Sequence, residues 1–286
     1  MSVGVRRLVS VMLAAAALAG CGSSAASDVS VPKVAPARTF SLAGFQPAGS
    51  VERGRPTTIS FVIQQPNGRP LTTYKTGPGP HTGIHLIIVR DDLTYIIHQH
   101  PPVGAGGMVH QTVTFPAPGP YRVLVDAYPN LPGGQSNFQL LRSVEVAGAY
   151  DPRPLPPFKP DLSVDGYHVD MQGNPALHAI QAQFVNVEVT DAHGAKVNFV
   201  PWFGALAHAI FFHEGSLDYF HTHVCAPGAL NCSSVLGATR ISGQSTSPGR
   251  LTLGVLLPVP GAWRLFLQMK LGGRVVTAPY TLQVAS

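Results

Sequence analysis

One stretch of the sequence, His85-Leu-Ile-Ile-Val-Arg-Asp-Asp-Leu-Thr-Tyr-Ile-Ile-His98-Gln-His100, carries the pattern on which the fold prediction depends. A histidine opens an apolar segment, two acidic residues interrupt it, and a His-x-His pair closes it. The pattern recurs at His208-Ala-Ile-Phe-Phe-His-Glu-Gly-Ser-Leu-Asp-Tyr-Phe-His221-Thr-His223 with the same histidine spacing. Two apolar segments around a short polar turn predict a β-hairpin. The sequence therefore predicts two equivalent hairpins.

The expected hairpin geometry brings the histidines of each copy together. A two-residue turn, at Asp91-Asp92 in the first copy and Glu214-Gly215 in the second, places the opening histidine opposite the first histidine of the His-x-His pair. Side chains alternate between faces with a period of two, so the last histidine joins them on one face. The predicted clusters are His85, His98 and His100 in the first copy, and His208, His221 and His223 in the second.

The segments around the hairpins also occur twice in the same order. Thr57–Ile63 and Gln183–Thr190 predict one pair of equivalent strands, and Tyr121–Asp126 and Trp263–Gln268 predict another. Only 12% of the residues are charged, and the chain contains 30 Gly and 27 Pro, which favours short strands and many turns. The prediction is an all-β chain with two tandem antiparallel β-sandwich domains, immunoglobulin-like or cupredoxin-like.

The N-terminus has the features of a secretory signal peptide. Arg6 and Arg7 precede the apolar segment Leu8–Ala19, and the next residues are Gly20 and Cys21. Leu18-Ala19-Gly20-Cys21 resembles a bacterial lipobox, which implies cleavage before Cys21 and lipidation of that residue. We therefore expect a lipoprotein anchored to the cell membrane on its extracytoplasmic face.

Composition along the chain predicts the domain boundaries. A small, polar segment follows Cys21, and the proline-rich segment Tyr150–Pro160 separates the two repeats. The predicted organisation is a signal peptide at 1–20, a lipidated tether at 21–38, a first β-sandwich at 39–148, a linker at 149–162 and a second β-sandwich at 163–286.

The histidine pattern resembles that of a group of bacterial extracytoplasmic proteins with immunoglobulin-like domains that are described as heavy-metal-binding or copper-binding. The matching residues are His85-Leu-Ile-Ile-Val89, Asp92-Leu-Thr-Tyr95 and His98-Gln-His100-Pro101. The second copy keeps the three histidines but has Val224 in place of the proline. The resemblance implies an immunoglobulin-like domain that binds a metal ion.

Three neutral imidazoles from two neighbouring strands are suitable ligands for copper or zinc. We therefore expect one three-histidine site in each domain, and a protein that binds or buffers a transition metal, with copper favoured. The alternative is that these histidines are core residues satisfied by backbone carbonyls. In that case the chain is a non-enzymatic cell-surface module whose partner is another protein.

Other residues are secondary candidates. Asp126 aligns with Gln268 in the second repeat, and one of the two is a candidate to orient an imidazole, although a polar residue that caps a strand end is the commoner case. Met269 is a candidate soft axial ligand, although a core methionine is the commoner case. The remaining histidines have no counterparts between the copies and are interpreted as surface or packing residues: His81, His110, His168, His178, His193 and His213.

Cys225 and Cys232 lie in an insertion that only the second copy contains. With Cys21 lipidated, the two remaining thiols predict a disulfide in an oxidising compartment. A different interpretation is that Cys225 continues the alternation of His221 and His223 and supplies a thiolate to a His₂Cys copper site. The two interpretations exclude each other.

The sequence contains no pattern typical of an enzyme or a nucleic-acid-binding protein. We find no serine nucleophile elbow, glycine-rich phosphate loop or His-Glu-x-x-His zinc helix. The net charge of +5 is spread along the chain without a Lys/Arg cluster. The expected partners are a metal ion and, through the lipid anchor, the membrane.

Overall fold

β-strands make up almost all of the regular structure in the computed structural model, which describes residues 39–226, 234–236, 239–241 and 243–286. The one helical element in these residues is a 3₁₀ turn, η1 (Ala105–Gly107). This confirms the predicted all-β class. Within the same residues we find no apolar helix of membrane-spanning length. The predicted signal peptide, Cys21 and the tether lie outside the described residues and stay predictions.

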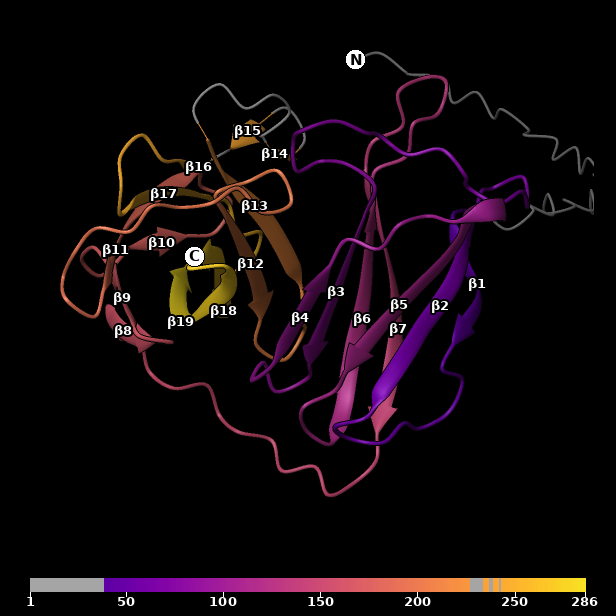
Figure 1. Cartoon of the computed structure of the whole chain (residues 1–286), viewed down its shortest axis with the longest axis horizontal. Coiled ribbons are helices and arrows are strands. Elements are labelled where there is room, and N and C mark those ends of the chain that lie inside the picture. The colour runs from indigo at the N-terminus through magenta and orange to yellow at the C-terminus, as the bar shows by residue number, and fades with distance from the viewer. Residues whose placement is uncertain (1–38, 227–233, 237–238, 242) are drawn as a thin grey trace, which may run out of the picture. The chain divides into compact units, whose positions relative to one another are not determined.

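The first repeat forms two antiparallel sheets on either side of a buried core (Figure 1, indigo to magenta). The strand orders are β1-β2-β5 and β4-β3-β6-β7. Ile59, Phe61 and Ile63 alternate along β2 and are at most 1% exposed, because every second side chain of a strand points to the same face. The strands are β1 (Ser41–Gln46), β2 (Pro56–Gln64), β3 (Ile84–Arg90), β4 (Ile96–Gln99), β5 (Met108–Thr114), β6 (Gly119–Ala127) and β7 (Phe138–Val146).

The second repeat uses equivalent strands in the same order, which confirms the tandem repeat (Figure 1, orange to yellow). Its strands are β8 (Asp161–Val164), β9 (Tyr167–Met171), β10 (Leu177–His178), β11 (Gln183–Asp191), β12 (Ala207–His213), β13 (Tyr219–Cys225), β14 (Ser234–Leu236), β15 (Thr239–Ile241), β16 (Gly243–Gln244), β17 (Arg250–Val255), β18 (Gly261–Leu271) and β19 (Arg274–Ala285).

One feature of the second repeat was not expected from the sequence. β16, which lies in the insertion after the second hairpin, pairs in parallel with β13 and antiparallel with β17. It therefore joins the two layers into one sheet of order β10-β19-β18-β12-β13-β16-β17-β11-β9-β8, which folds around one buried cluster. The two repeats belong to one unit, Arg38–Ser286, and the predicted domain boundaries stay a prediction.

The predicted two-residue hairpin turns are wrong. In the first hairpin Ile87 pairs with His98, and Arg90 N donates to Tyr95 O at 3.0 Å, so the connection runs from Asp91 to Thr94. The second hairpin has the equivalent register, with Ile210 opposite His221. The register differs from the prediction by two residues. A shift of two leaves every side chain on its predicted face, whereas a shift of one would reverse all of them.

The longer turns are explained by burial of a leucine in each. Leu93 and Leu217 have positive φ values of 59° and 58°, which are unfavourable for residues with a Cβ. Both side chains are buried, at 1% and 5% exposure, in a cluster made by both repeats, here called the interface core. Its members are Ile87, Val89, Leu93 and Leu124 from the first repeat, and Ile210, Phe212, Leu217 and Phe266 from the second.

The interface core accounts for the continuous burial of the two central strands. In β3, Leu86 and Ile88 point into the core of the first repeat, whereas Ile87 and Val89 point into the interface core. Strands buried on both faces have unbroken apolar sequences instead of alternating ones. The apolar segments of the two hairpins therefore result from contact between the repeats as well as from packing within each of them.

We expect Leu217→Ala to lower the free energy of unfolding by about 3 kcal/mol, a typical value for a buried leucine. Alanine also carries a Cβ, so the positive-φ strain is unchanged and the loss reports burial in the interface core. Urea unfolding measures the effect, and Leu141→Ala is the control because Leu141 is 47% exposed. Equal stability of the two variants would show that the interface core does not stabilise the protein.

Candidate functional site

The histidine-bearing faces of the two hairpins contact each other at one end of the interface core. On β3, His85 lies on the same face as Ile87, and on β12, His208 lies on the same face as Ile210. The His-x-His pairs come from β4 with the residue after it, and from β13. Imidazole rings contact one another across the repeats: the ring centroids of His85 and His221 are 5.3 Å apart, and those of His98 and His208 are 5.0 Å apart.

The six predicted ligands form one cluster and not two separate sites. Among the described residues, three groups have ligand nitrogens within 4.8 Å of one another: His85, His98 and His100; His85, His221 and His223; and His98, His208 and His221. The first group is the triad predicted for the first domain. The triad predicted for the second domain is not one of the three, because its members group with histidines of the first repeat instead.

Three imidazoles of the cluster form hydrogen bonds to residues outside it. The Nε2 atom of His85 lies 2.8 Å from the carbonyl oxygen of Pro80, and Nε2 of His208 lies 2.9 Å from that of Trp202. Since a carbonyl only accepts, each Nε2 carries the proton and each Nδ1 keeps its lone pair. This arrangement, with one nitrogen bonded to a carbonyl and the other free to coordinate, is typical of metal-binding histidines.

The third held imidazole connects the two repeats. Nδ1 of His98 lies 3.1 Å from Oε1 of Gln268 on β18, so this bond leaves Nε2 of His98 facing the cluster. One of the two predicted orienting residues, Gln268, therefore does contact a cluster imidazole, and it does so across the repeats. The sequence alignment alone could not show that its partner would be on the other hairpin.

The remaining nitrogens of the cluster have few partners. Nδ1 of His85, Nδ1 of His221 and both ring nitrogens of His223 are buried and make no hydrogen bond within the protein. Buried polar atoms normally have a partner, because leaving one unpaired costs about 1 to 3 kcal/mol. His85, His221 and His223 therefore each have at least one buried ring nitrogen without a partner, which is an unusual concentration of unsatisfied polar atoms.

Burial keeps the cluster neutral at physiological pH. Desolvation lowers the pKa of His85 to about 3 and that of His208 to about 4. It also lowers the pKa of His98, His221 and His223 well below the usual value, and that of His100 strongly. Repulsion from neighbouring imidazoles acts in the same direction for most of them. A neutral imidazole has a free lone pair, so all six residues are in the form that binds a metal ion.

Two loops that precede β3 and β12 cover the cluster and supply residues that the sequence prediction missed. The ring of Phe203 stacks on that of His100 at 3.8 Å, and the ring of Trp202 lies 5.0 Å from that of His208. His81, predicted to be a surface or packing residue, places its ring 4.7 Å from that of His223. These loop residues have no periodic pattern that could have revealed them.

The same two loops meet at Gly204, which has φ +78°. A Cβ there would lie 2.5 Å from the carbonyl carbon of Gly79 and 2.7 Å from the nitrogen of Pro80. We expect Gly204→Ala to push the loops apart, to weaken the bond between Pro80 and His85, and so to reduce metal affinity about tenfold. Gly194→Ala is the control, because Gly194 has a similar φ of +81° and no atom within 4 Å of the added Cβ. Equal affinity of the two variants, measured by metal titration, would contradict this role of the loops.

The other secondary candidates have different outcomes. Asp126 is 2% exposed and accepts hydrogen bonds from Asn137 at 3.0 Å and Gln139 at 3.2 Å. Burial raises the pKa of Asp126 to about 6 against the opposing effect of these bonds. Met269 is buried in the core of the second repeat, on the opposite face of β18 from Gln268, which confirms the favoured interpretation as a core methionine and excludes it as an axial ligand.

Cys225 ends β13, and its sulfur is disulfide-bonded. The predicted partner, Cys232, lies outside the described residues, so the pairing of these two cysteines stays a prediction. A disulfide sulfur offers no thiolate to an ion, and none of the three histidine groups includes Cys225. The structure therefore does not support the alternative His₂Cys copper site.

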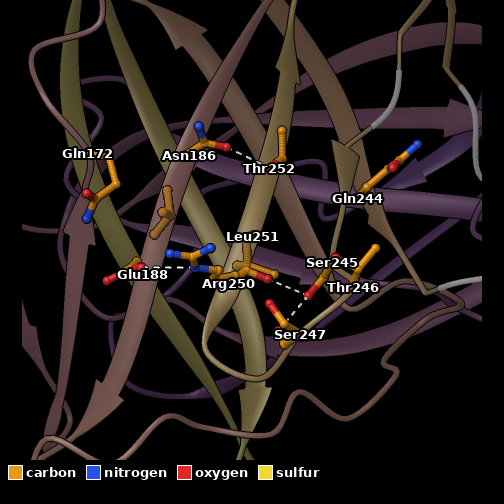
Figure 2. Close-up of a pocket in the computed structure, with 11 residues that line it drawn as sticks. Gln172, Asn186, Glu188, Gln244, Ser245, Thr246, Ser247, Arg250, Leu251 and Thr252 are labelled. Atoms are coloured by element: carbon orange, nitrogen blue, oxygen red, sulfur yellow. Dashed lines mark hydrogen bonds and ion pairs between the residues drawn. The ribbon is translucent and has the colours of Figure 1, made fainter.

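A separate polar pocket lies on the second repeat between β11, β16 and β17 (Figure 2). Its charged groups are paired, because Nε of Arg250 lies 3.1 Å from Oε1 of Glu188. The hydroxyl of Thr252 donates to the side-chain oxygen of Asn186 at 2.7 Å. The pocket contains no predicted ligand and, unlike the histidine cluster, its paired polar groups do not indicate a ligand of particular chemistry.

Comparison with models of protein families gives a match within the second repeat. Residues 162–286 match the model of a domain of unknown function, DUF8832. No curated protein matches the chain. Among solved structures, native E. coli alpha-2-macroglobulin is 16% identical, with 87% of this chain and 14% of that chain covered and a TM-score of 0.27. The fibronectin(III)-like modules of Clostridium thermocellum CbhA are 12% identical, with 86% and 93% covered and a TM-score of 0.21. The bacterial integrin-binding protein invasin is 14% identical, with 86% and 39% covered and a TM-score of 0.23.

Proposed function

We propose that this protein binds or buffers one transition-metal ion, copper or zinc, between its two repeats. The observation that carries the proposal is the set of three overlapping histidine groups whose ligand nitrogens lie within 4.8 Å of one another. Each group contains at least one residue that a hydrogen bond to a carbonyl or amide oxygen already orients. The protein part of a metal site is therefore largely preorganised.

The overlap between the groups limits the site to one ion at a time. Any two of them share a histidine, which is His85, His98 or His221. A neutral imidazole has one lone pair, so it cannot serve two ions at once. In the observed side-chain positions, two complete three-histidine sites cannot be filled together, and we propose one ion per chain where the hairpins taken separately suggested two.

The unpaired ring nitrogens argue against a purely structural role for the histidines. Core histidines would be expected to bond to backbone carbonyls through every buried N–H and to leave few lone pairs unused. Here His223 has no hydrogen-bond partner on either nitrogen, although it is only 1% exposed. A bound ion would use the lone pair of His223 and remove the cost of burying it unpaired.

The chemistry of the donors favours copper or zinc. Imidazole nitrogen suits both ions. Among the described residues neither candidate sulfur is available to the cluster, because Cys225 is disulfide-bonded and Met269 faces away. Of the two ions, copper binds nitrogen ligands more tightly. Five of the six histidines are buried, which leaves little space for a substrate, and we propose binding and not catalysis. The extracytoplasmic location and the lipid anchor at Cys21 are part of the same proposal.

Titration of the protein produced without its signal peptide tests the proposal directly. We expect one Cu²⁺ or Zn²⁺ per chain, and a stabilisation of about 2.7 kcal/mol when the free ion is at 100 times its Kd. Cu²⁺ should also quench the fluorescence of Trp202, which lies beside the cluster, more than that of Trp263, which is buried in the core of the second repeat. Two bound ions per chain would indicate separate sites. If the protein bound no ion and a chelator left its stability unchanged, the alternative of a protein-interaction module would be favoured.

A further inference from the structure

The two repeats differ at one position beside the cluster, where the first has a carboxylate and the second an amide. Asp126 on β6 pairs in register with His85 on β3, and Gln268 on β18 pairs in the same way with His208 on β12. Side chains that are directly opposite in antiparallel strands share a face, so both point toward the other repeat. They occupy equivalent places in the two halves of the site.

Gln268 indicates the role of the residue at this position, which is to orient a histidine of the other repeat. It does not bond to the histidine beside it but reaches across the interface to Nδ1 of His98 at 3.1 Å, which turns Nε2 of His98 into the cluster. The histidine equivalent to His98 in the second repeat is His221. By the correspondence of the repeats, the residue placed to orient His221 is Asp126.

The environment of His221 fits this assignment. Its Nε2 faces the cluster, 3.3 Å from Nδ1 of His208, and its Nδ1 is buried without a partner. Asp126 pairs with His85, whose ring lies 5.3 Å from that of His221. Burial and the nearby carboxylate of Asp126 raise the pKa of Tyr219, whose ring lies 6.0 Å from that of His221. Asp126 therefore lies near the part of β13 where Nδ1 of His221 would need an acceptor once Nε2 binds an ion.

We infer that Asp126 is the positioning residue of His221: its carboxylate accepts a hydrogen bond from Nδ1–H when Nε2 binds the ion, and it supplies the negative charge of the site. This inference rests on the proposed metal site. A carboxylate bonded to a ligand imidazole raises its basicity. It also offsets one charge of a bound cation, which helps a divalent ion more than a monovalent one. The site therefore selects divalent over monovalent cations through Asp126.

Competition titrations with Zn²⁺ and Ag⁺, both without redox chemistry, test the inference in wild type and Asp126→Asn. Asparagine keeps the shape of the side chain but removes the charge. We expect Zn²⁺ affinity to fall about 10- to 100-fold and Ag⁺ affinity to change much less, so that the Zn²⁺/Ag⁺ affinity ratio falls. Equal loss for both ions, or no loss for either, would overturn the inference.

A second variant keeps the test independent of folding defects. Gln268→Glu adds a carboxylate at the equivalent position of the other repeat, and it should raise the Zn²⁺/Ag⁺ ratio in the wild-type background and restore it in Asp126→Asn. An unchanged ratio in both backgrounds would contradict the role of charge at this position. If the wild-type protein binds neither Zn²⁺ nor Ag⁺, the proposed function itself is wrong. If it binds both ions but Asp126→Asn leaves the affinity ratio unchanged, only the inference about Asp126 is wrong.

Discussion

Replacing His98 and His221 together by alanine is expected to abolish metal binding while both sandwich cores stay folded. Each of the three histidine groups contains at least one of these two residues, so the double variant leaves no complete group. The stoichiometry measured by metal titration should fall from one ion per chain to none. Far-UV circular dichroism should be unchanged, because neither side chain is part of the apolar core clusters.

The single variants should rank in a defined order. His85, His98 and His221 each belong to two groups, whereas His100, His208 and His223 each belong to one. Loss of a shared histidine leaves one group intact, and loss of an unshared one leaves two, so the first set should reduce affinity more. His110→Ala combined with His193→Ala is the matched control, because both residues are exposed and outside the cluster. If His98→Ala and His221→Ala each removed one of two bound ions, the shared site would be wrong.

Without metal, the protein should lose stability sharply between about pH 6.5 and pH 5. The pKa of each of the six histidines lies below its ordinary value of about 6.5. The unfolded chain then binds more protons than the folded one, so the stability present above pH 6.5 is lost as the pH falls. Each histidine contributes at most about 1.4 kcal/mol per pH unit. Six together reach roughly 8 kcal/mol per pH unit, which is comparable to the whole stability of a typical domain.

The two tryptophans distinguish opening of the cluster from global unfolding. Trp202 lies beside His98 and His208, whereas Trp263 is 0% exposed in the core of the second repeat. In a Trp263→Phe variant the remaining fluorescence reports the cluster, and in a Trp202→Phe variant it reports the core. We expect the Trp202 signal to change first as the pH falls, and bound Zn²⁺ to shift that change to lower pH because the ion competes with protons. A Trp202 signal that is constant down to pH 4.5 would contradict the prediction.

Strand periodicity was sufficient to predict which side chains share a face. Strand periodicity predicted that His85, His98 and His100 would converge, and the structure shows this even though the predicted turn was two residues too short. The result survives that error because a shift of two residues preserves the face. The same periodicity placed Gln268 beside the histidines and, applied strictly, would also have excluded Met269, its neighbour on the opposite face.

The merging of the two predicted sites into one depends on contacts between the repeats, which no local sequence pattern indicates. The length of each turn depends on a leucine held at positive φ by burial in the interface core, and local sequence preference gives no indication of this. The partners of the histidines come from the other repeat, as with Gln268, or from loops that have no periodicity, as with Trp202. Contacts between the repeats depend on which apolar faces bury each other. A strand that is apolar on both faces has the same sequence pattern whether its second face packs within its own domain or against another domain.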